Sequence, residues 1–254
     1  MCLILFAFKS HPRYKLIVAA NRDEFYRRKT ALAHFWEDNP NILAGRDLEK
    51  MGTWMGVTKD GRFAALTNFR NPKQQLDGKR SRGELVAGAL EHSGPIKSYM
   101  ETLHSKDENY PGFNLLAGNL HDLYYYSNVE KKIRRLSPGI FGLSNHLLDT
   151  PWPKVEIGKR HLKEIIEGER EFTAESLFSL LRNDDIYPDE LLPRTGVPFE
   201  LERKLSSIFI KTDDYGTRTS TVILGDNEKI QFFERTYADG KIIGERTFQI
   251  AYSK

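Results

Sequence analysis

Several patterns that define common protein classes are missing from this chain of 254 residues. With a single cysteine it can form no intramolecular disulfide, and no apolar run approaches the ~18 residues that a membrane-spanning helix needs. Glycine-rich phosphate loops, His-Glu-x-x-His, paired Cys-x-x-Cys and Gly-x-Ser-x-Gly are also absent. These absences disfavour common nucleotide-binding enzymes, zinc hydrolases and secreted disulfide-rich proteins. We expect no metal, no cofactor, no transmembrane segment and a cytoplasmic location, where a thiol stays reduced.

The charge balance disfavours nucleic acid as a partner. There are 38 basic and 35 acidic residues, which give a net charge of +3 without a long run of either sign. The basic residues between Arg70 and Arg82 lack interleaved aromatic side chains beyond Phe69, as expected of a solvated loop. No linker or repeat divides the sequence, so we expect one domain over residues 1–254.

The predicted strands and helices follow one another in blocks. Ser81-Arg82-Gly83-Glu84 has the spacing of a capping box before a helix. Blocks of strands and helices, in place of strict alternation, predict an α+β fold with antiparallel sheets. The expected strands are 3–8, 14–20, 53–58, 62–68, 113–117, 123–126, 140–144, 219–224, 229–235 and 245–252, and the expected helices follow Ser81 and cover 96–103, 153–166 and 174–181.

The only cysteine, Cys2, directly follows the initiator methionine. Removal of Met1, expected before a small second residue, leaves a thiol and a free α-amine on one residue. That amine has a pKa near ~8 and can take the proton of its own nucleophile. On position alone, the alternative of a small buried residue at the start of a strand is favoured.

The first predicted hairpin places a charged quartet beside Cys2. A loop over Lys9–Arg13 puts Cys2 opposite Ala20, to within about two residues, next to Asn21-Arg22-Asp23-Glu24. There an arginine can lower the thiol pKa and an aspartate can orient the amine. The alternative is a solvated strand end that starts a turn.

Polar residues lie at the ends of three further predicted strands. Asn68 and Asn145 each follow an apolar strand, and Arg218 precedes one. Asparagine amides can donate to an oxyanion, and an arginine can hold a thiolate or a substrate carbonyl. Each residue alone is more often a turn former or a solvated charge.

Taken together, the motifs resemble those of the NRDE family, which includes the transport and Golgi organisation protein 2 relatives. They are Met-Cys, Asn21-Arg22-Asp23-Glu24, Gly52-Thr53-Trp54, Ala65-Leu66-Thr67-Asn68, Arg82-Gly83-Glu84-Leu85, Gly142-Leu143-Ser144-Asn145 and Gly216-Thr217-Arg218-Thr219. The family in turn resembles the N-terminal nucleophile (Ntn) hydrolases. This resemblance implies a four-layer αββα sandwich of two antiparallel sheets flanked by helices.

Choloylglycine hydrolases and penicillin V acylases offer the nearest analogy for site residues. Carried over by motif, Cys2 is the nucleophile and Asp23 holds the amine, while Asn68 and Asn145 lie near the oxyanion and Arg218 is the late arginine. Asn21 and Arg22 are candidate substrate-binding residues. Those acylases have an arginine where this chain has Ala20, and strand alternation allows Arg22 to supply that charge from the same side.

The leading hypothesis is a cysteine Ntn hydrolase that acts on the amide or related acyl bond of a small molecule. The alternative is a non-catalytic binding or trafficking module on the same fold, for a lipid-like or haem-like ligand. The aromatic run Tyr124-Tyr125-Tyr126 is compatible with that alternative, although aromatic strands usually belong to a core.

Overall fold

The computed structural model describes residues 2–168 and 172–252, and in this part of the chain the strands form two antiparallel sheets. One sheet has the order β10-β1-β2-β11-β12-β13 and the other the order β3-β4-β5-β6-β7-β8-β9. The strands are β1 Cys2–Phe8, β2 Leu16–Phe25, β3 Thr30–Phe35, β4 Ile42–Asp47, β5 Met55–Thr58, β6 Phe63–Asn68, β7 Phe113–Gly118, β8 Leu123–Ser127, β9 Lys132–Arg135, β10 Gly139–Leu143, β11 Tyr215–Gly225, β12 Lys229–Ala238 and β13 Lys241–Ala251.

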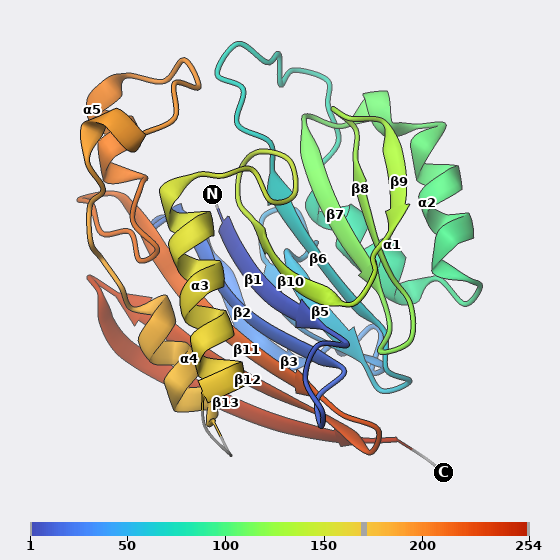
Figure 1. The fold of residues 1–254 in the computed structure, drawn as a ribbon. Helices are drawn as coiled ribbons and strands as arrows, with labels where there is room; N and C mark the ends of the chain where they lie inside the picture. The colour runs from blue at the N-terminus through green and yellow to red at the C-terminus, as the bar shows by residue number, and fades with distance from the viewer. Residues whose placement is uncertain (1, 169–171, 253–254) are drawn as a thin grey trace.

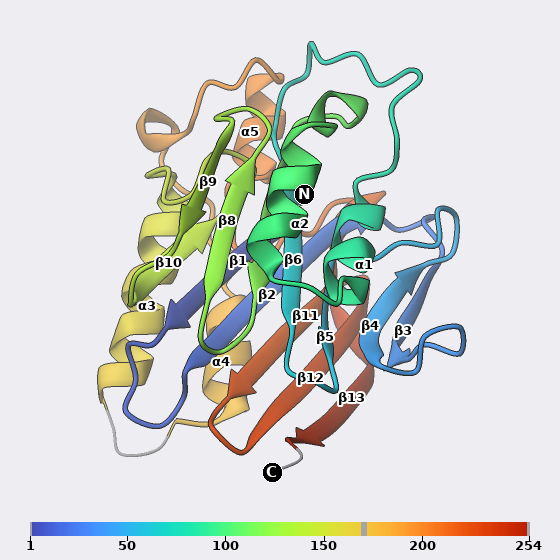
Figure 2. The ribbon, with the colours of Figure 1, turned by 90° about the vertical axis from the view of Figure 1, so that its right-hand side faces the viewer.

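Helices cover the outer face of each sheet. Helices α3 and α4 pack on the six-stranded sheet, and α1 and α2 pack on the seven-stranded sheet (Figures 1 and 2). The predicted four-layer αββα sandwich is therefore confirmed. No helix in the described ranges has the length and apolar character needed to cross a membrane. The helices are α1 Gly83–Glu91, α2 Ile96–His104, α3 Pro153–Gly168, α4 Ala174–Leu181 and α5 Phe199–Lys204, with short 3-10 turns at Asp107–Asn109 and Asp189–Leu191.

Strands β1 and β2 are buried on both faces, which explains their nearly continuous apolar sequences. Ile4 and Phe6 point into the core between the sheets, whereas Leu3 and Leu5 point toward α3 and α4. Cys2 shares its side of the strand with Ile4 and Phe6, so the two-residue period directs its thiol between the sheets.

The first hairpin has a longer loop than predicted, and its register differs accordingly. The chain between β1 and β2 runs from Lys9 to Lys15, and Cys2 pairs with Arg22 in place of Ala20. The shift of two residues lies within the expected margin and preserves the face of every side chain. It places the charged quartet directly beside the cysteine.

The other predicted elements agree with the structure in type. The turn between β5 and β6 has Gly61 at φ +87°, a left-handed conformation that favours glycine. Strands β3, β4 and β9 and the short helix α5 were not predicted, because their sequences have no clear apolar periodicity. The capping box at Ser81 was wrong: α1 begins after Arg82 without a side-chain cap, and the Glu84 carboxylate pairs with Arg80.

Candidate active site

A cavity of about 290 Å³ opens where β1 begins and β2 ends, between the two sheets. Cys2, Arg22 and Asp23 line it from the six-stranded sheet, and Asn68 lines it from the end of β6 in the other sheet. Four of the seven predicted site residues therefore meet in one place. Much of the remaining lining comes from the loop before α1 and from the β3–β4 end of the second sheet.

Cys2 is 8% exposed, and its backbone is held on both sides. It pairs with Arg22 of β2, and the Ser144 hydroxyl donates to its carbonyl at 3.2 Å. Burial raises the pKa of the Cys2 thiol, while Arg22 acts in the opposite direction. At neutral pH the thiol is therefore protonated and needs a base. Met1, whose removal frees the amine of Cys2, lies outside the described residues.

Asp23 is 1% exposed at the end of β2. The Thr217 hydroxyl donates to its Oδ1 at 2.7 Å, and the Tyr215 hydroxyl donates to its carbonyl at 2.9 Å. Burial raises the pKa of the Asp23 carboxyl, and the nearby Lys154 ammonium counteracts this. Two residues of β11 thus hold Asp23 near Cys2.

Lys154, in the first turn of α3, is a buried cation that the sequence analysis missed; it does not line the cavity but interacts electrostatically with Asp23. It is 2% exposed, and its Nζ donates to the carbonyl of Leu205 at 2.9 Å. Burial lowers the pKa of Lys154 to about 8, against the favourable field of Asp23. Because it lies in an otherwise ordinary amphipathic helix, no sequence signal distinguished it from a solvated lysine.

The two predicted asparagines have different positions. Asn68 lines the cavity, and no hydrogen bond of its side-chain amide is found with the residues that the structure describes. Asn145 lies behind it, fully buried, and its Nδ2 donates to the Asn68 carbonyl at 2.9 Å. The backbone N–H of Arg70 in turn donates to the Asn145 carbonyl at 2.7 Å. Asn145 therefore holds Asn68 in place.

Arg22 lines the cavity with a side chain that is 8% exposed. Its Nη2 lies 3.6 Å from Glu24 Oε2, and its buried Nη1 has no hydrogen-bond partner among residues 2–168 and 172–252. The carboxyl of Glu234 lies in its field and accepts a hydrogen bond from the Ala33 N–H at 2.8 Å. Burial raises the pKa of Glu234 to about 7, so Glu234 only partly balances the charge of Arg22 near neutral pH.

Besides Asn145, two predicted site residues, Asn21 and Arg218, do not line the cavity. Asn21 points to the helix side of its sheet, where its Nδ2 donates to the carbonyls of Leu181 and Ile208, both at 2.9 Å. A β-bulge displaces Arg218 from the β11 ladder, and its Nη1 donates to the carbonyls of Phe25, Tyr26 and Arg28. Strand alternation explains the position of Asn21, and the bulge explains that of Arg218. Both side chains donate to backbone carbonyls of the protein and not to the cavity.

Arg82, the residue that precedes α1, also lines the cavity. It belongs to one of the short motifs recognised in the sequence, but nothing there indicated that it faces Cys2. The described residues contain no group of three or more histidine, cysteine or acidic side chains that could hold a metal ion.

Comparison with known proteins identifies the family of the chain. The model of the family described as Transport and Golgi organisation 2 matches residues 1–239. The Transport and Golgi organization protein 2 homologs of Bos taurus and Homo sapiens are each 38% identical to this chain. The match covers 93% of both chains for the bovine protein and 94% of both for the human one.

A solved structure supports the architecture. The Caenorhabditis elegans ortholog of N-acylethanolamine-hydrolyzing acid amidase aligns with a TM-score of 0.50 and 12% identity, over 88% of this chain and 92% of the other. At this identity the likeness concerns the fold, which is that of Ntn-type amidohydrolases.

Proposed function

The chain belongs to the Transport and Golgi organisation 2 family, and we propose that it is a cysteine Ntn hydrolase that cleaves the C–N bond of a small acyl amide. One observation carries the proposal. The thiol of Cys2 faces a cavity between two sheets, beside a buried aspartate and an asparagine amide that is available to a ligand.

The reaction begins with the amine of Cys2, freed by loss of Met1. The amine accepts the thiol proton as the sulfur attacks the acyl carbon, and the proton passes to the leaving nitrogen as the C–N bond breaks. The products of this step are a thioester on Cys2 and a free amine. Water then attacks the thioester, and a carboxylic acid leaves while the thiol is restored.

Asn68 and Asp23 have separate roles in this proposal. The Asn68 amide donates to the oxygen that becomes negative in each tetrahedral intermediate, which is the main requirement of such a site. Asn145 acts as a positioning residue through its hydrogen bond to the Asn68 carbonyl. Asp23, held by Thr217, orients the amine of Cys2.

A binding module for a lipid-like or haem-like ligand has less support. Most of the cavity lining is polar or charged, with only a few apolar side chains such as Trp54, Leu66 and Leu76. A lipid pocket is expected to be mainly apolar. No histidine, the commonest haem ligand, is part of the lining.

We also propose a cytoplasmic site of action, since a reducing compartment keeps a free cysteine in its thiol form. An antibody against the chain, used on fractionated cells, would place it elsewhere if the idea is wrong.

The test of this proposal is an insertion that separates the thiol of Cys2 from a free α-amine. A glutamate inserted between Met1 and Cys2 prevents removal of the methionine, so the thiol remains but its α-amine is lost. The assay measures the amine that is released from N-octanoyl amides. We expect hydrolysis by the untagged native protein and none by the insertion variant or by Cys2→Ala. Exposed Ser10→Ala is the control and keeps full activity. Equal hydrolysis by the insertion variant would refute the mechanism.

A further inference from the structure

The cavity lining is strongly basic. Seven basic side chains and three acidic ones, Asp23, Glu24 and Asp47, line it. Two of the arginines in the lining have close acidic partners: Arg28 lies 2.6 Å from Asp47, and Arg80 lies 2.8 Å from Glu84. The inner arginines beside Cys2 are not neutralised in this way.

Arg82 is one of these inner arginines. It forms no ion pair with any residue of the described ranges, and its Nη1 donates only to the Gly112 carbonyl, at 3.1 Å. Burial lowers the pKa of Arg82 to about 10, so it stays charged at neutral pH, and it interacts electrostatically with Cys2 and Glu24. It is therefore a mostly buried cation with a neutral hydrogen-bond partner.

Two glycines fix the position of Arg82. The Thr53 N–H donates to the Gly83 carbonyl at 3.1 Å, and a Cβ on Gly52 would lie 2.5 Å from the carbonyl carbon of Gly83. Only glycine at position 52 allows the two backbones to approach so closely. This contact brings the residue before α1 against the wall of the cavity.

Arg22 is the second inner arginine and comes from the opposite sheet. Among the described residues its one acidic neighbour within ion-pair distance is Glu24, at 3.6 Å, which is too long for a hydrogen bond. Its buried Nη1 has no hydrogen-bond partner in this part of the chain. Glu234 below it holds a proton for much of the time near pH 7.

A buried cation without a matched anion is unfavourable, because the lost hydration is not replaced. Arg22 and Arg82 line the same cavity from different elements, and each interacts electrostatically with Cys2. A guanidinium group is suited to carboxylate and phosphate oxygens, which supply both charge and paired acceptors. An anionic group on the ligand removes the cost of burying both arginines.

We propose that the ligand carries an anionic oxygen group, a carboxylate or a phosphate, and that this group binds between Arg22 and Arg82 beside the thiol of Cys2. In the hydrolase, which is the proposed function on which this inference rests, the substrate is an acyl amide whose anionic group lies within a few bonds of the attacked carbonyl.

The test measures binding without turnover, in Cys2→Ala, which also removes any effect of the arginines on the thiol. The probes are two matched pairs: N-octanoylglycine against N-octanoylglycinamide, and N-octanoylethanolamine phosphate against N-octanoylethanolamine. Calorimetry is expected to give one or both anionic members an affinity about 10- to 100-fold above that of the neutral partner. The pair that shows the preference identifies a carboxylate or a phosphate.

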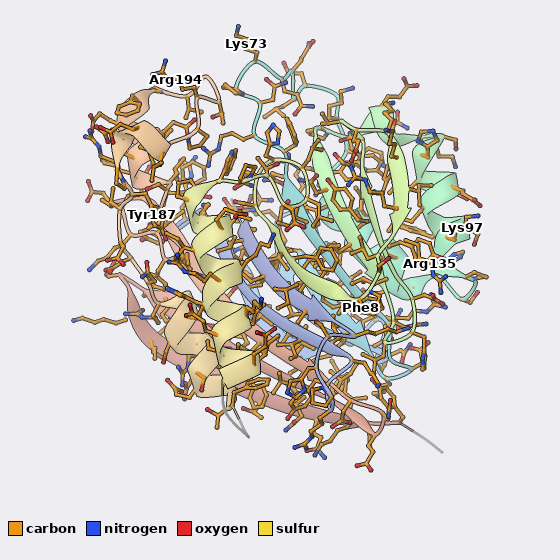
Figure 3. All side chains as sticks on the ribbon, viewed as in Figure 1. Phe8, Lys73, Lys97, Arg135, Tyr187 and Arg194 are labelled. Carbon is orange, nitrogen blue, oxygen red and sulfur yellow. The ribbon has the colours of Figure 1, made fainter. Side chains whose placement is uncertain are left out.

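Arginine variants in the same background assign the preference. Arg82→Gln and Arg22→Gln are expected to bring the anionic and neutral affinities within about threefold of each other, while Arg82→Lys keeps part of the preference. Arg135→Gln is the control. Arg135 lies at the end of β9 (Figure 3), pairs with Asp122 and is not part of the lining. Thermal unfolding of each variant verifies its fold, and Arg82→Lys decides if the glutamine variant does not fold.

Three results would overturn the inference: equal binding within both pairs, an anion preference that survives loss of either arginine, or no binding of any probe at millimolar concentration. The proposed hydrolysis fails separately. If Cys2→Ala prefers the anions but the native protein releases no amine, the anion site stands and the reaction does not.

Discussion

The two ends of the β1–β2 hairpin are equally buried but differ in chemistry. Near the loop, Phe6, Phe8 and Val18 are at most 1% exposed in the core between the sheets. At the open end, Arg22 and Asp23 are 7% and 1% exposed. Both ends lie in the same two strands under the same layers. Exposure to water therefore does not explain the charge at the open end. Burial of these charged groups costs stability, which is typical of functional sites.

At the loop end, truncation of Phe6 is expected to cause the largest loss of stability. This side chain is fully buried and stacks on Phe141 with ring centroids 5.0 Å apart. Phe6→Ala is expected to lower the free energy of unfolding by about 3–5 kcal/mol, through lost burial and a cavity. Denaturant unfolding measures it. A loss below about 1 kcal/mol would show that this part of the core is not tightly packed.

At the open end, Glu234 is expected to make stability depend on pH. Its pKa rises on folding from 4.5 to about 7, so between these values the folded protein binds more protons than the unfolded chain. The contribution of Glu234 to the free energy of unfolding, roughly 3 kcal/mol, is fully present below pH 4.5 and is lost as the pH rises to 7. Glu234→Gln should remove this part of the pH dependence in urea titrations. An unchanged slope would contradict the assignment.

Asp23→Asn separates catalysis from stability at the same end. The variant keeps an acceptor for the Thr217 hydroxyl but loses the charge that orients the amine. We expect kcat for N-octanoyl amides to fall by about 100-fold, while the free energy of unfolding is unchanged or higher because a buried charge is removed. Full activity in this variant would exclude Asp23 from the mechanism.

Substitution of Arg218 should have the smallest effect, and it should lower stability without changing ligand binding, the opposite of Asp23→Asn. Arg218→Met loses the hydrogen bonds to three carbonyls of the chain that follows β2, which we expect to cost about 2 kcal/mol of stability. Because Arg218 does not line the cavity, N-octanoylglycine should bind to the Cys2→Ala background as before. A binding loss without a stability loss would return Arg218 to the site.

Much of the fold could be predicted because its strands are long and apolar and its turns carry their own signals. Helix α4 begins and ends at the predicted residues, whereas β3 and β4 were missed because their sequences mix polar and apolar residues. Strand β4 pairs with β5 and β3 pairs with β4, and the local sequence does not encode these pairings.

The site was predictable where a residue directly follows or begins a strand, as with Cys2, Arg22 and Asn68. Side-chain direction was harder to predict. Asn21 alternates to the helix side, and a single bulge redirects Arg218. Arg82 reaches the cavity only through a glycine contact between distant segments, and Lys154 comes near Asp23 only because α3 packs on the six-stranded sheet.

The most direct test of the central claim is the intact mass of the untagged protein before and after brief exposure to p-nitrophenyl octanoate, with an acid quench. We expect a chain that lacks Met1 and then gains one octanoyl group, which peptide mapping places on Cys2. Retention of Met1, or an octanoyl group located elsewhere or absent, would contradict an N-terminal nucleophile at this cavity.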